Sequence, residues 1–235
     1  MSRSTCAVIV AGGTGSRFGR PGGKQLAELC GKPVLTWSVQ AFDAAPSIEA
    51  IVVVVPPARV EEMRELVFSQ LGCSTPLCVA PSGATRQQSV RSGVGQAPET
   101  CTYVAVHDGA RPLVSVDIIE ASISALDNAP QLSGVICAAR VTDTLKISRD
   151  GVAIDDTPDR SLYWSAQTPQ VFRRAELLHW HELAADEGRE VTDDAALAER
   201  YGARVGLCES PRDNIKVTMP EDLALAEALL AVRGA

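Results

Sequence analysis

Hydrophobic runs and amphipathic stretches alternate along the first 140 residues of the chain. Short, continuous apolar runs are typical of buried strands, and they occur at residues 7–11, 50–55, 77–79, 103–106 and 135–139. The segments between them carry apolar residues at helical spacing, which predicts helices over residues 33–45, 58–71, 87–94 and 116–129. Strands that alternate with helices indicate right-handed βαβ crossovers. We therefore predict an α/β, single-domain, Rossmann-like fold, a mostly parallel twisted sheet flanked by helices.

The alternation breaks after residue 139. Residues 142–148 and 152–156 alternate between polar and apolar positions, and Asp150-Gly151 between them favours a hairpin turn. We predict a protruding β-hairpin arm over residues 140–160. An isolated hairpin is marginal in water, so pairing with the same arm of a second chain would cover its apolar residues in a two-fold homodimer. Helices over 173–187, 192–200 and 220–232 and a strand over 204–208 complete the single domain, residues 1–235.

Composition narrows the class of protein. The net charge of −7 argues against a general nucleic-acid binder, which would present a basic face. The seven cysteines are dispersed without a C-x-x-C pair, which favours reduced thiols over disulfides or a zinc site. The apolar runs are too short to span a membrane, and six residues before the first strand leave no room for a targeting peptide. We therefore expect a cytoplasmic protein without a membrane partner.

The first strand is followed by Gly12-Gly13-Thr14-Gly15-Ser16-Arg17, with Lys24-Gln25 close behind. Such a loop exposes main-chain N–H groups and adds two cations, which suits a polyphosphate. A dinucleotide site would require an acidic residue at the end of the next strand, but that strand ends in Pro56-Pro57. A P-loop would require Ser or Thr after the lysine, where Gln25 stands. The loop therefore indicates a nucleoside-triphosphate site of another kind.

Residues 11–17 with Lys24-Gln25 resemble the signature loop of nucleotidyltransferases that activate phosphorylated sugars and polyols. Later stretches resemble, more narrowly, the 2-C-methyl-D-erythritol 4-phosphate cytidylyltransferase family of the non-mevalonate isoprenoid pathway. These stretches are residues 83–89, 107–112, 143–146, 159–160, 167–170, 192–194 and 214–218. The chain departs from the family pattern at Gly109, where alanine is usual, and at Gly23, where most relatives have proline.

The resemblance implies a role for each matching residue in the transfer of a cytidylyl group from CTP to a polyol phosphate. The implied catalytic residues are Arg17, Lys24 and Lys216. Nucleotide-binding residues would be Ala11, Gly12, Gly13, Gly83, Arg86, Ser89, Asp108 and Gly109. Substrate-binding residues would be Asp108, Thr144, Arg160, Thr168, Thr192 and Lys216. Mg²⁺ would be bound mainly through the CTP phosphates, and the partner's arm could carry Arg160 into the neighbouring active site.

Three alternatives remain open at this point. A ribitol-5-phosphate cytidylyltransferase would share the fold, the nucleotide and the mechanism. A nicotinamide-dependent oxidoreductase could use the glycine turn, although the ribose-binding acid is missing. A catalytically silent nucleotide-binding regulator is the third. His179 and His181 are two apart on a helix and point in different directions, so we expect helix-surface residues there, not a metal pair.

Overall fold

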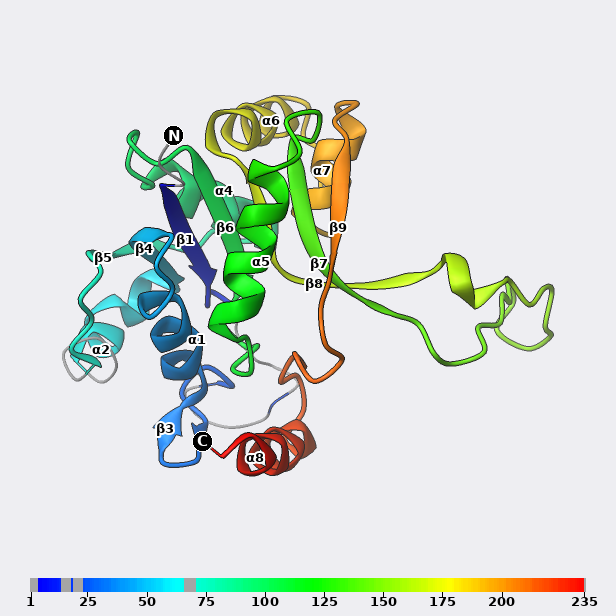
Figure 1. Ribbon diagram of the computed structural model, residues 1–235, viewed down its shortest axis with the longest axis horizontal. Helices are drawn as coiled ribbons and strands as arrows, with labels where there is room; N and C mark the ends of the chain where they lie inside the picture. Colours follow the sequence, from blue (N-terminus) through cyan, green and yellow to red (C-terminus); the bar gives the residue numbers. More distant parts are fainter. Residues whose placement is uncertain (1–3, 14–17, 19–22, 66–70, 235) are drawn as a thin grey trace.

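The computed structural model describes residues 4–13, 18, 23–65 and 71–234. A mixed sheet of seven strands runs through these residues in the order β5-β4-β1-β6-β8-β7-β9 (Figure 1). The strands are β1 (Thr5–Val10), β4 (Ile48–Val55), β5 (Leu77–Pro81), β6 (Tyr103–Asp108), β7 (Gly134–Arg140), β8 (Trp164–Arg173) and β9 (Val205–Glu209). Every neighbouring pair of these strands is parallel except those that β8 forms with β6 and β7. The predicted mostly parallel α/β sheet is confirmed.

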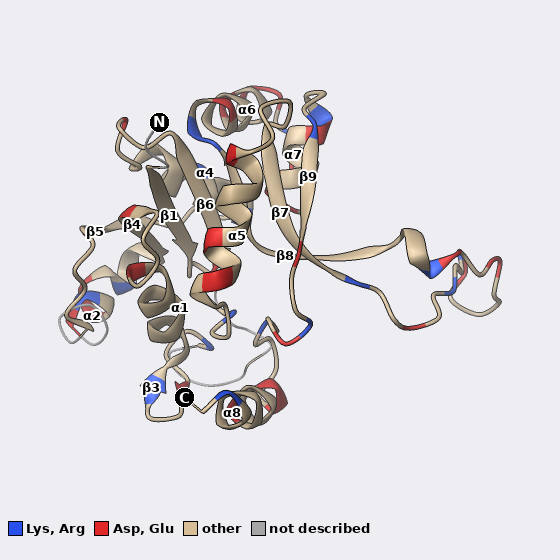
Figure 2. Cartoon of the chain, viewed as in Figure 1, with Lys and Arg blue, Asp and Glu red and all other residues tan. Residues whose placement is uncertain are grey.

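Helices cover both faces of the sheet, which explains why the central strands are apolar on both sides. The described helices are α1 (Val34–Asp43), α2 (Val60–Met63), α4 (Arg86–Gly95), α5 (Val116–Asp127), α6 (Arg174–Asp186), α7 (Asp194–Arg200) and α8 (Glu221–Arg233). Helices α1 and α5 bury their apolar residues in one core with β1 and β4. Helices α4, α6 and α7 form a second core on the other face. Charged residues lie mainly on helices and loops around these cores (Figure 2).

Helix α8 packs separately, below the carboxyl ends of the strands (Figure 1). Its Leu223, Ala226 and Leu230 share a third cluster with Leu29 and Val217. Leu29 belongs to a short ribbon formed by β2 (Glu28–Leu29) and β3 (Lys32–Pro33). This third cluster lies beside the strand ends where the polar loops gather. None of the described helices is long and apolar enough to cross a membrane.

The predicted helices and strands are found with shifted ends, apart from three differences, and the short ribbon of β2 and β3 was also not predicted. Strand β8 was not predicted, since its sequence mixes buried polar residues such as Gln167 and Gln170 with apolar ones. The helix expected over 58–71 is described as the short α2, preceded by the 3-10 turn η2 (Pro57–Arg59), and residues 66–70 lie outside the described part.

The arm is the third difference. The chain between β7 and β8 projects far from the sheet as expected (Figure 1). However, the two strands predicted over 142–148 and 152–156 are wrong, because within this fully described segment a single bridge joins Ile147 to Asp156. Acidic side chains bond the backbone instead: Asp150 Oδ1 accepts from Val152 N at 2.8 Å, and Asp155 Oδ2 accepts from Arg149 N at 2.7 Å. Such local bonds compete with a strand ladder.

Candidate active site

A cleft of about 510 Å³ opens at the carboxyl ends of β1, β4, β5 and β6, where open parallel sheets bind ligands. Its size falls within the usual range for small-molecule sites. Among the described residues, three with cationic side chains line it, namely Lys24, Arg86 and Lys216, together with the carboxylate of Asp108. The remaining lining residues are Val10, Gly12, Gly13, Gln25, Pro56, Ser82, Gly83, Ala84, Thr85, Ser89 and Ala110. The loops that follow β1, β5 and β6 therefore share one cleft.

The glycine loop forms one wall of the cleft. A Cβ on Gly12 would lie 2.3 Å from Ser82 Cβ. The main chain of the glycine loop therefore contacts the Ser82 side chain of the loop that follows β5. A Cβ on Gly13 would meet nothing within 4 Å, which leaves its main chain open to a ligand. Ala11 lies beneath the wall, buried in the core, and its N–H bonds Val54 O at 2.7 Å. Arg17 lies outside the described residues.

A second, adjoining wall is the turn that leads into α4. Thr85 caps the helix by accepting a bond from Gln88 N. Ser89 Oγ donates to Thr85 O at 2.8 Å and accepts from Gly83 N at 3.1 Å. Ser89 is buried, so in this chain it holds the shape of the turn that lines the cleft.

Asp108 joins the cations at the centre of the cleft. Its Oδ2 lies 2.7 Å from Lys216 Nζ, and its Oδ1 lies 3.4 Å from Arg86 Nε. Burial alone would raise the pKa of Asp108, but Arg86, Lys216 and Arg111 outweigh burial and hold that pKa well below its usual range. The carboxylate therefore stays ionised and fixes the position of the Lys216 ammonium.

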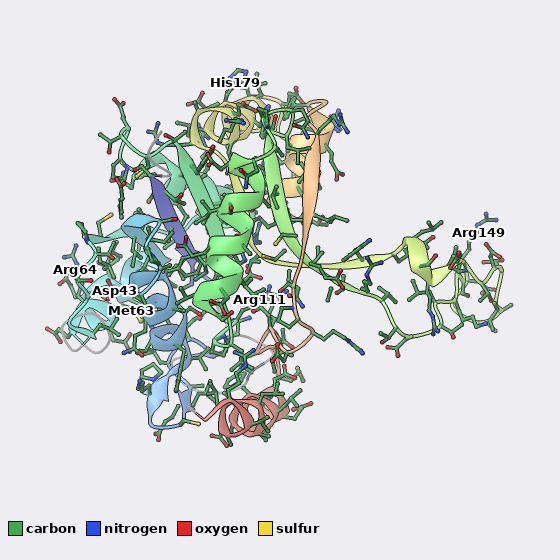
Figure 3. All side chains as sticks on the ribbon, in the orientation of Figure 1. Asp43, Met63, Arg64, Arg111, Arg149 and His179 are labelled. Carbon is green, nitrogen blue, oxygen red and sulfur yellow. The ribbon has the colours of Figure 1, made fainter. Side chains whose placement is uncertain are left out.

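Asp194 and His181, to which the sequence analysis gave no role in the site, hold Arg86 from the side away from the cleft. Its Nη1 lies 2.8 Å from Asp194 Oδ2, and His181 Nε2 lies 3.2 Å from Asp194 Oδ1. His181 is 1% exposed, so the expectation that it lies on the helix surface is wrong. His179 is exposed as expected (Figure 3). The reason is that α6 packs on α4 and α7, which turns position 181 inward.

The signal for Asp194 was the Thr192-Asp193-Asp194 stretch, which matches the family pattern although no role was expected for Asp194. Asp193 caps α7 by accepting a bond from Ala196 N at 2.9 Å. The next residue, Asp194, is then turned toward Arg86. Burial would raise the pKa of Asp194, yet Arg86 and His181 lower it.

Lys216 comes from a segment that is bonded firmly to the loop after β6. Asn214 Nδ2 donates to Thr168 O at 2.9 Å, and Arg111 Nη1 donates to Asn214 O at 2.7 Å. Val217 N donates to Ala110 O at 2.8 Å. Arg111 lies near the carboxyl end of β6 in Figure 3. These bonds explain how a lysine 108 residues after Asp108 along the chain reaches it.

A smaller recess of about 160 Å³ adjoins the cleft and shares Arg86, Asp108 and Lys216 with it. Its other lining residues are Arg111, Ala166, Gln167, Thr168, Gln170, Thr192 and Asp193. An irregularity in the pairing of β8 with β7 forms this recess. Ile136 pairs with Gln170 but Ala138 pairs with Ala166, so the pairing advances by four residues on β8 and by only two on β7. Such a bulge re-aims side chains.

Thr168 lies in this irregular stretch and is buried. Its Oγ1 accepts a bond from Asp108 N at 3.1 Å and lies 3.0 Å from His107 Nδ1. Complete burial of the imidazole lowers the pKa of His107 to about 3. Neutral His107 can therefore accept the Thr168 hydroxyl hydrogen at Nδ1 and donate from Nε2 to Arg111 O at 3.3 Å. This chain of bonds fixes the backbone that carries Asp108.

The remaining residues of the expected site lie elsewhere. Thr144 and Arg160 are exposed on the arm, where Arg160 Nη1 donates to Thr142 O, and neither lines the two recesses of its own chain. A Cβ on Gly109 would point at Leu35 Cδ1 and Ile9 Cγ2, into the core and not into the cleft. Among the described residues no group of three His, Cys, Asp or Glu side chains could hold a metal ion.

A glycine-walled, cation-lined cleft at the switch point of a mostly parallel sheet is where α/β folds bind nucleotide phosphates. The family model for 2-C-methyl-D-erythritol 4-phosphate cytidylyltransferase matches residues 5–232. The chain belongs to this family. It is 40% identical to the enzyme of that name from Caldanaerobacter subterraneus, over 95% of this chain and 97% of the relative.

Further comparisons agree. A relative of the same name from Parasynechococcus marenigrum is 43% identical over 96% of this chain and 97% of its own length. The crystal structure of 4-diphosphocytidyl-2C-methyl-D-erythritol synthase from Anaerococcus prevotii is similar with a TM-score of 0.85 and 26% identity, covering 98% of this chain and all of the other. The oxidoreductase and silent-regulator alternatives are thereby set aside, and the ribitol-5-phosphate alternative is not favoured.

Proposed function

We propose that this chain transfers the cytidylyl group of CTP to 2-C-methyl-D-erythritol 4-phosphate and releases pyrophosphate. The observation that carries the proposal is the meeting of two recesses at a shared boundary of Arg86, Asp108 and Lys216. A reaction between a nucleotide and a smaller phosphomonoester needs two adjoining pockets with cations between them. The names of the relatives supply the two substrates.

In this proposal the larger cleft takes CTP. The triphosphate would lie along the main chain of Gly12 and Gly13, with Lys24 at the pyrophosphate. Lys24 is half-buried beside the loop, and it acts electrostatically on Asp222 at the start of α8. Cytosine and ribose would contact the turn from Gly83 to Ser89, whose shape is fixed by its own hydrogen bonds.

The smaller recess would take the polyol phosphate. Thr192 lines this recess and is exposed, so its hydroxyl can reach the acceptor. Thr168 would act mainly by holding Asp108, because its hydroxyl already bonds Asp108 N. Asp108 would hold a substrate hydroxyl and orient Lys216.

The acceleration would come from alignment and charge. A phosphomonoester oxygen of the acceptor attacks the α-phosphate, the bond to the β-phosphate oxygen breaks, and pyrophosphate leaves. Lys216 lies at the boundary of the two recesses, where negative charge would grow at the α-phosphate. Its ammonium is held in advance by Asp108 at 2.7 Å, so little reorganisation is needed during the reaction.

The residues present fit a Mg²⁺ ion that is bound chiefly by the substrate. Asp108 is the carboxylate that lines the larger cleft, and it is already paired with Lys216. Mg²⁺ favours substrate phosphates with one or two carboxylates. When bound, the ion would neutralise part of the triphosphate charge.

We further propose a cytoplasmic homodimer. The arm exposes Val152, Ile154 and Leu162 at 90%, 63% and 78%, and a second arm could cover these apolar side chains. Arg160 and Thr144 lie on the arm, remote from the recess lining of their own chain, which suits a role in the partner's site. The cysteines are free thiols, which suits a reducing compartment.

Incubation with CTP, Mg²⁺ and either methylerythritol phosphate or ribitol 5-phosphate tests the reaction. We expect pyrophosphate release with the first acceptor and little with the second. Equal release with both acceptors, or release with the second alone, would contradict the proposed acceptor. A parallel assay that omits the acceptor measures background CTP hydrolysis.

The choice of nucleotide is a separate prediction. A pocket that offers fixed main-chain hydrogen bonds to the cytosine edge leaves polar groups unpaired when the base is wrong. We expect kcat/KM for CTP to exceed that for UTP by about 100-fold or more. Comparable kcat/KM values for CTP and UTP would show that the turn at residues 83–89 does not recognise the base.

A further inference from the structure

Two cysteines face each other at the edge of the sheet that is remote from the glycine loop. Cys137 of β7 and Cys208 of β9 are register partners in a parallel pair. Neighbouring strands lie about 4.8 Å apart, and the Cα atoms of disulfide-bonded cysteines are about 4.4–6.8 Å apart. Partner residues in such a pair extend from the same face of the sheet. The backbone therefore already has a spacing at which the two sulfurs can be joined.

The two thiols differ in exposure. Cys137 is completely buried, and it lies at the position where the pairing of β7 with β8 is irregular. Cys208 is half-buried on β9, which is the last strand in the sheet order. A small reagent from solvent can therefore reach Cys208 but not Cys137. This arrangement provides one accessible thiol with a second one directly behind it.

The thiols also differ in acidity. The hydrogen bond with the Cys137 thiol lowers the pKa of Cys208 below its ordinary value. The same bond, together with burial, raises the pKa of Cys137 above its ordinary value. Because the thiolate is the nucleophile, Cys208 is the more reactive of the two thiols. Cys78, on β5 at the other edge of the sheet, has its pKa raised by burial.

We infer that Cys208 and Cys137 form a redox modification site, in which Cys208 reacts first with a hydroperoxide and Cys137 then closes a reversible disulfide. The Cys208 thiolate attacks one oxygen of hydrogen peroxide, the O–O bond breaks, and the departing hydroxide takes up a proton to give water. The Cys137 sulfur next attacks the Cys208 sulfenic acid, and the S–O bond breaks. The Cys137 proton and the released hydroxide leave as a second water. Two thiols are oxidised and one peroxide is reduced.

The position of the pair connects it to the active site. β9 continues through Ser210, whose N–H bonds Ala138 O at 2.9 Å, into the segment that carries Lys216. A disulfide at this point would clamp that segment at its origin. Arg111, which holds Asn214, also acts electrostatically on Cys137. The disulfide would therefore join β7 to β9 just before the chain enters the segment that carries Lys216.

Peptide mapping of the full-length protein tests the inference. The reduced, folded protein is exposed to hydrogen peroxide in modest excess, quenched with an alkylating reagent, digested and analysed without reduction. We expect a linked peptide pair that contains Cys137 and Cys208 and that dithiothreitol separates. In Cys137→Ser the reaction should stop at a Cys208 sulfenic acid, which dimedone traps. In Cys208→Ser the linked pair should be absent and Cys137 should stay unmodified.

Cys78→Ser is the matched control, since it removes a thiol from the opposite edge of the sheet and should leave the linked pair unchanged. Loss of the linked pair in this control would mean unspecific thiol exchange and would overturn the inference. So would oxidation of Cys30 or Cys78 ahead of Cys208, or accumulation of Cys208 sulfinic acid in the wild type without a bond to Cys137. If Cys137→Ser fails to fold, dimedone added to the wild type together with the peroxide replaces it, and dimedone should then label Cys208 at the expense of the linked pair.

Discussion

The cleft and the arm differ in where their side chains find partners. In the cleft, Asp108 pairs with Lys216 and Arg86, and Asp194 and Asn214 are bonded behind them, all within one chain. On the arm, acidic side chains bond their own backbone while Val152 and Ile154 remain exposed. Figure 3 shows Arg111, which lines the smaller recess, in the body of the molecule and Arg149 far out on the arm.

This contrast separates two ways of building a site. The cleft is organised in advance by buried charges whose partners are already present, which is what electrostatic catalysis requires. The arm presents apolar surface that a monomer rarely leaves exposed without an interaction to cover it. The cleft should therefore be sensitive to single substitutions within one chain, whereas the arm should act only through a second chain.

The largest effect should come from the cleft. Lys216→Ala removes the ammonium at the boundary of the two recesses, and we expect kcat to fall by about 100- to 1,000-fold with a smaller change in KM for the acceptor. Steady-state kinetics measures this. Lys32→Ala, which alters an exposed lysine over Trp37, is the matched control and should turn over normally. Near-normal turnover in Lys216→Ala would remove this residue from the mechanism.

Mixing two inactive variants tests the arm. Lys24→Ala damages the cleft and Arg160→Ala damages the arm, so a mixed dimer with shared sites has one intact site and one doubly defective site. We expect an equal mixture to regain about a quarter of wild-type activity, because half of the dimers are mixed and each has one intact site. Subunit exchange is verified by native mass spectrometry. Absence of recovery despite exchange would assign Arg160 to its own chain.

The buried imidazole behind the cleft predicts a pH effect on stability. His107 has its pKa lowered to about 3 by burial, whereas the pKa of histidine in an unfolded chain is about 6.5. Between these values the unfolded chain binds a proton that the folded protein does not. The free energy of unfolding should therefore fall as the pH is lowered from about 6.5, by up to about 1.4 kcal/mol per pH unit.

His107→Gln should remove this slope in urea unfolding measured between pH 6.5 and 4.5. His179→Gln, on the exposed surface of α6, is the control and should keep the wild-type slope. A further loss below about pH 4 is expected in both variants, since the depressed pKa values of Asp108 and Asp194 stabilise the fold only while these groups are ionised. An unchanged slope in His107→Gln would contradict the assignment.

The smallest effect should come from restoring the family's usual alanine. In Gly109→Ala the new Cβ would meet Leu35 Cδ1 at 2.7 Å, Ile9 Cγ2 at 3.2 Å and Val10 O at 3.3 Å, so the end of the buried Leu35 side chain must shift. We expect a loss of about 1 kcal/mol or less in stability and an unchanged KM for CTP. Gly93→Ala is the comparison, because its Cβ would meet Val8 Cγ1 at 2.4 Å and Val54 Cγ2 at 2.7 Å. These stiff β-branched side chains should make the loss about 2–3 kcal/mol.

The sequence by itself determined the parallel part of the sheet and most of the cleft. Runs such as residues 50–55 are apolar because helices cover both faces of the strand, and this pattern is readable locally. The loops after β1, β5 and β6 must share one edge once the strands are parallel, so the order of strands and loops along the chain is enough to bring Gly12, Arg86 and Asp108 together. The resemblance to a family added Lys216.

Only the tertiary structure decided how these residues are held. The insertion of β8 between β6 and β7, with the irregular stretch that carries Thr168, depends on pairing between distant segments that no local pattern encodes. The packing of α6 and α7 against α4 decides which face of each helix is buried. His181 and Asp194 lie on the buried faces and therefore hold Arg86 in place. The two strands predicted for the arm do not form because no other element of the described chain packs against it. With no packed neighbour to favour a ladder, its own carboxylates bond the backbone first.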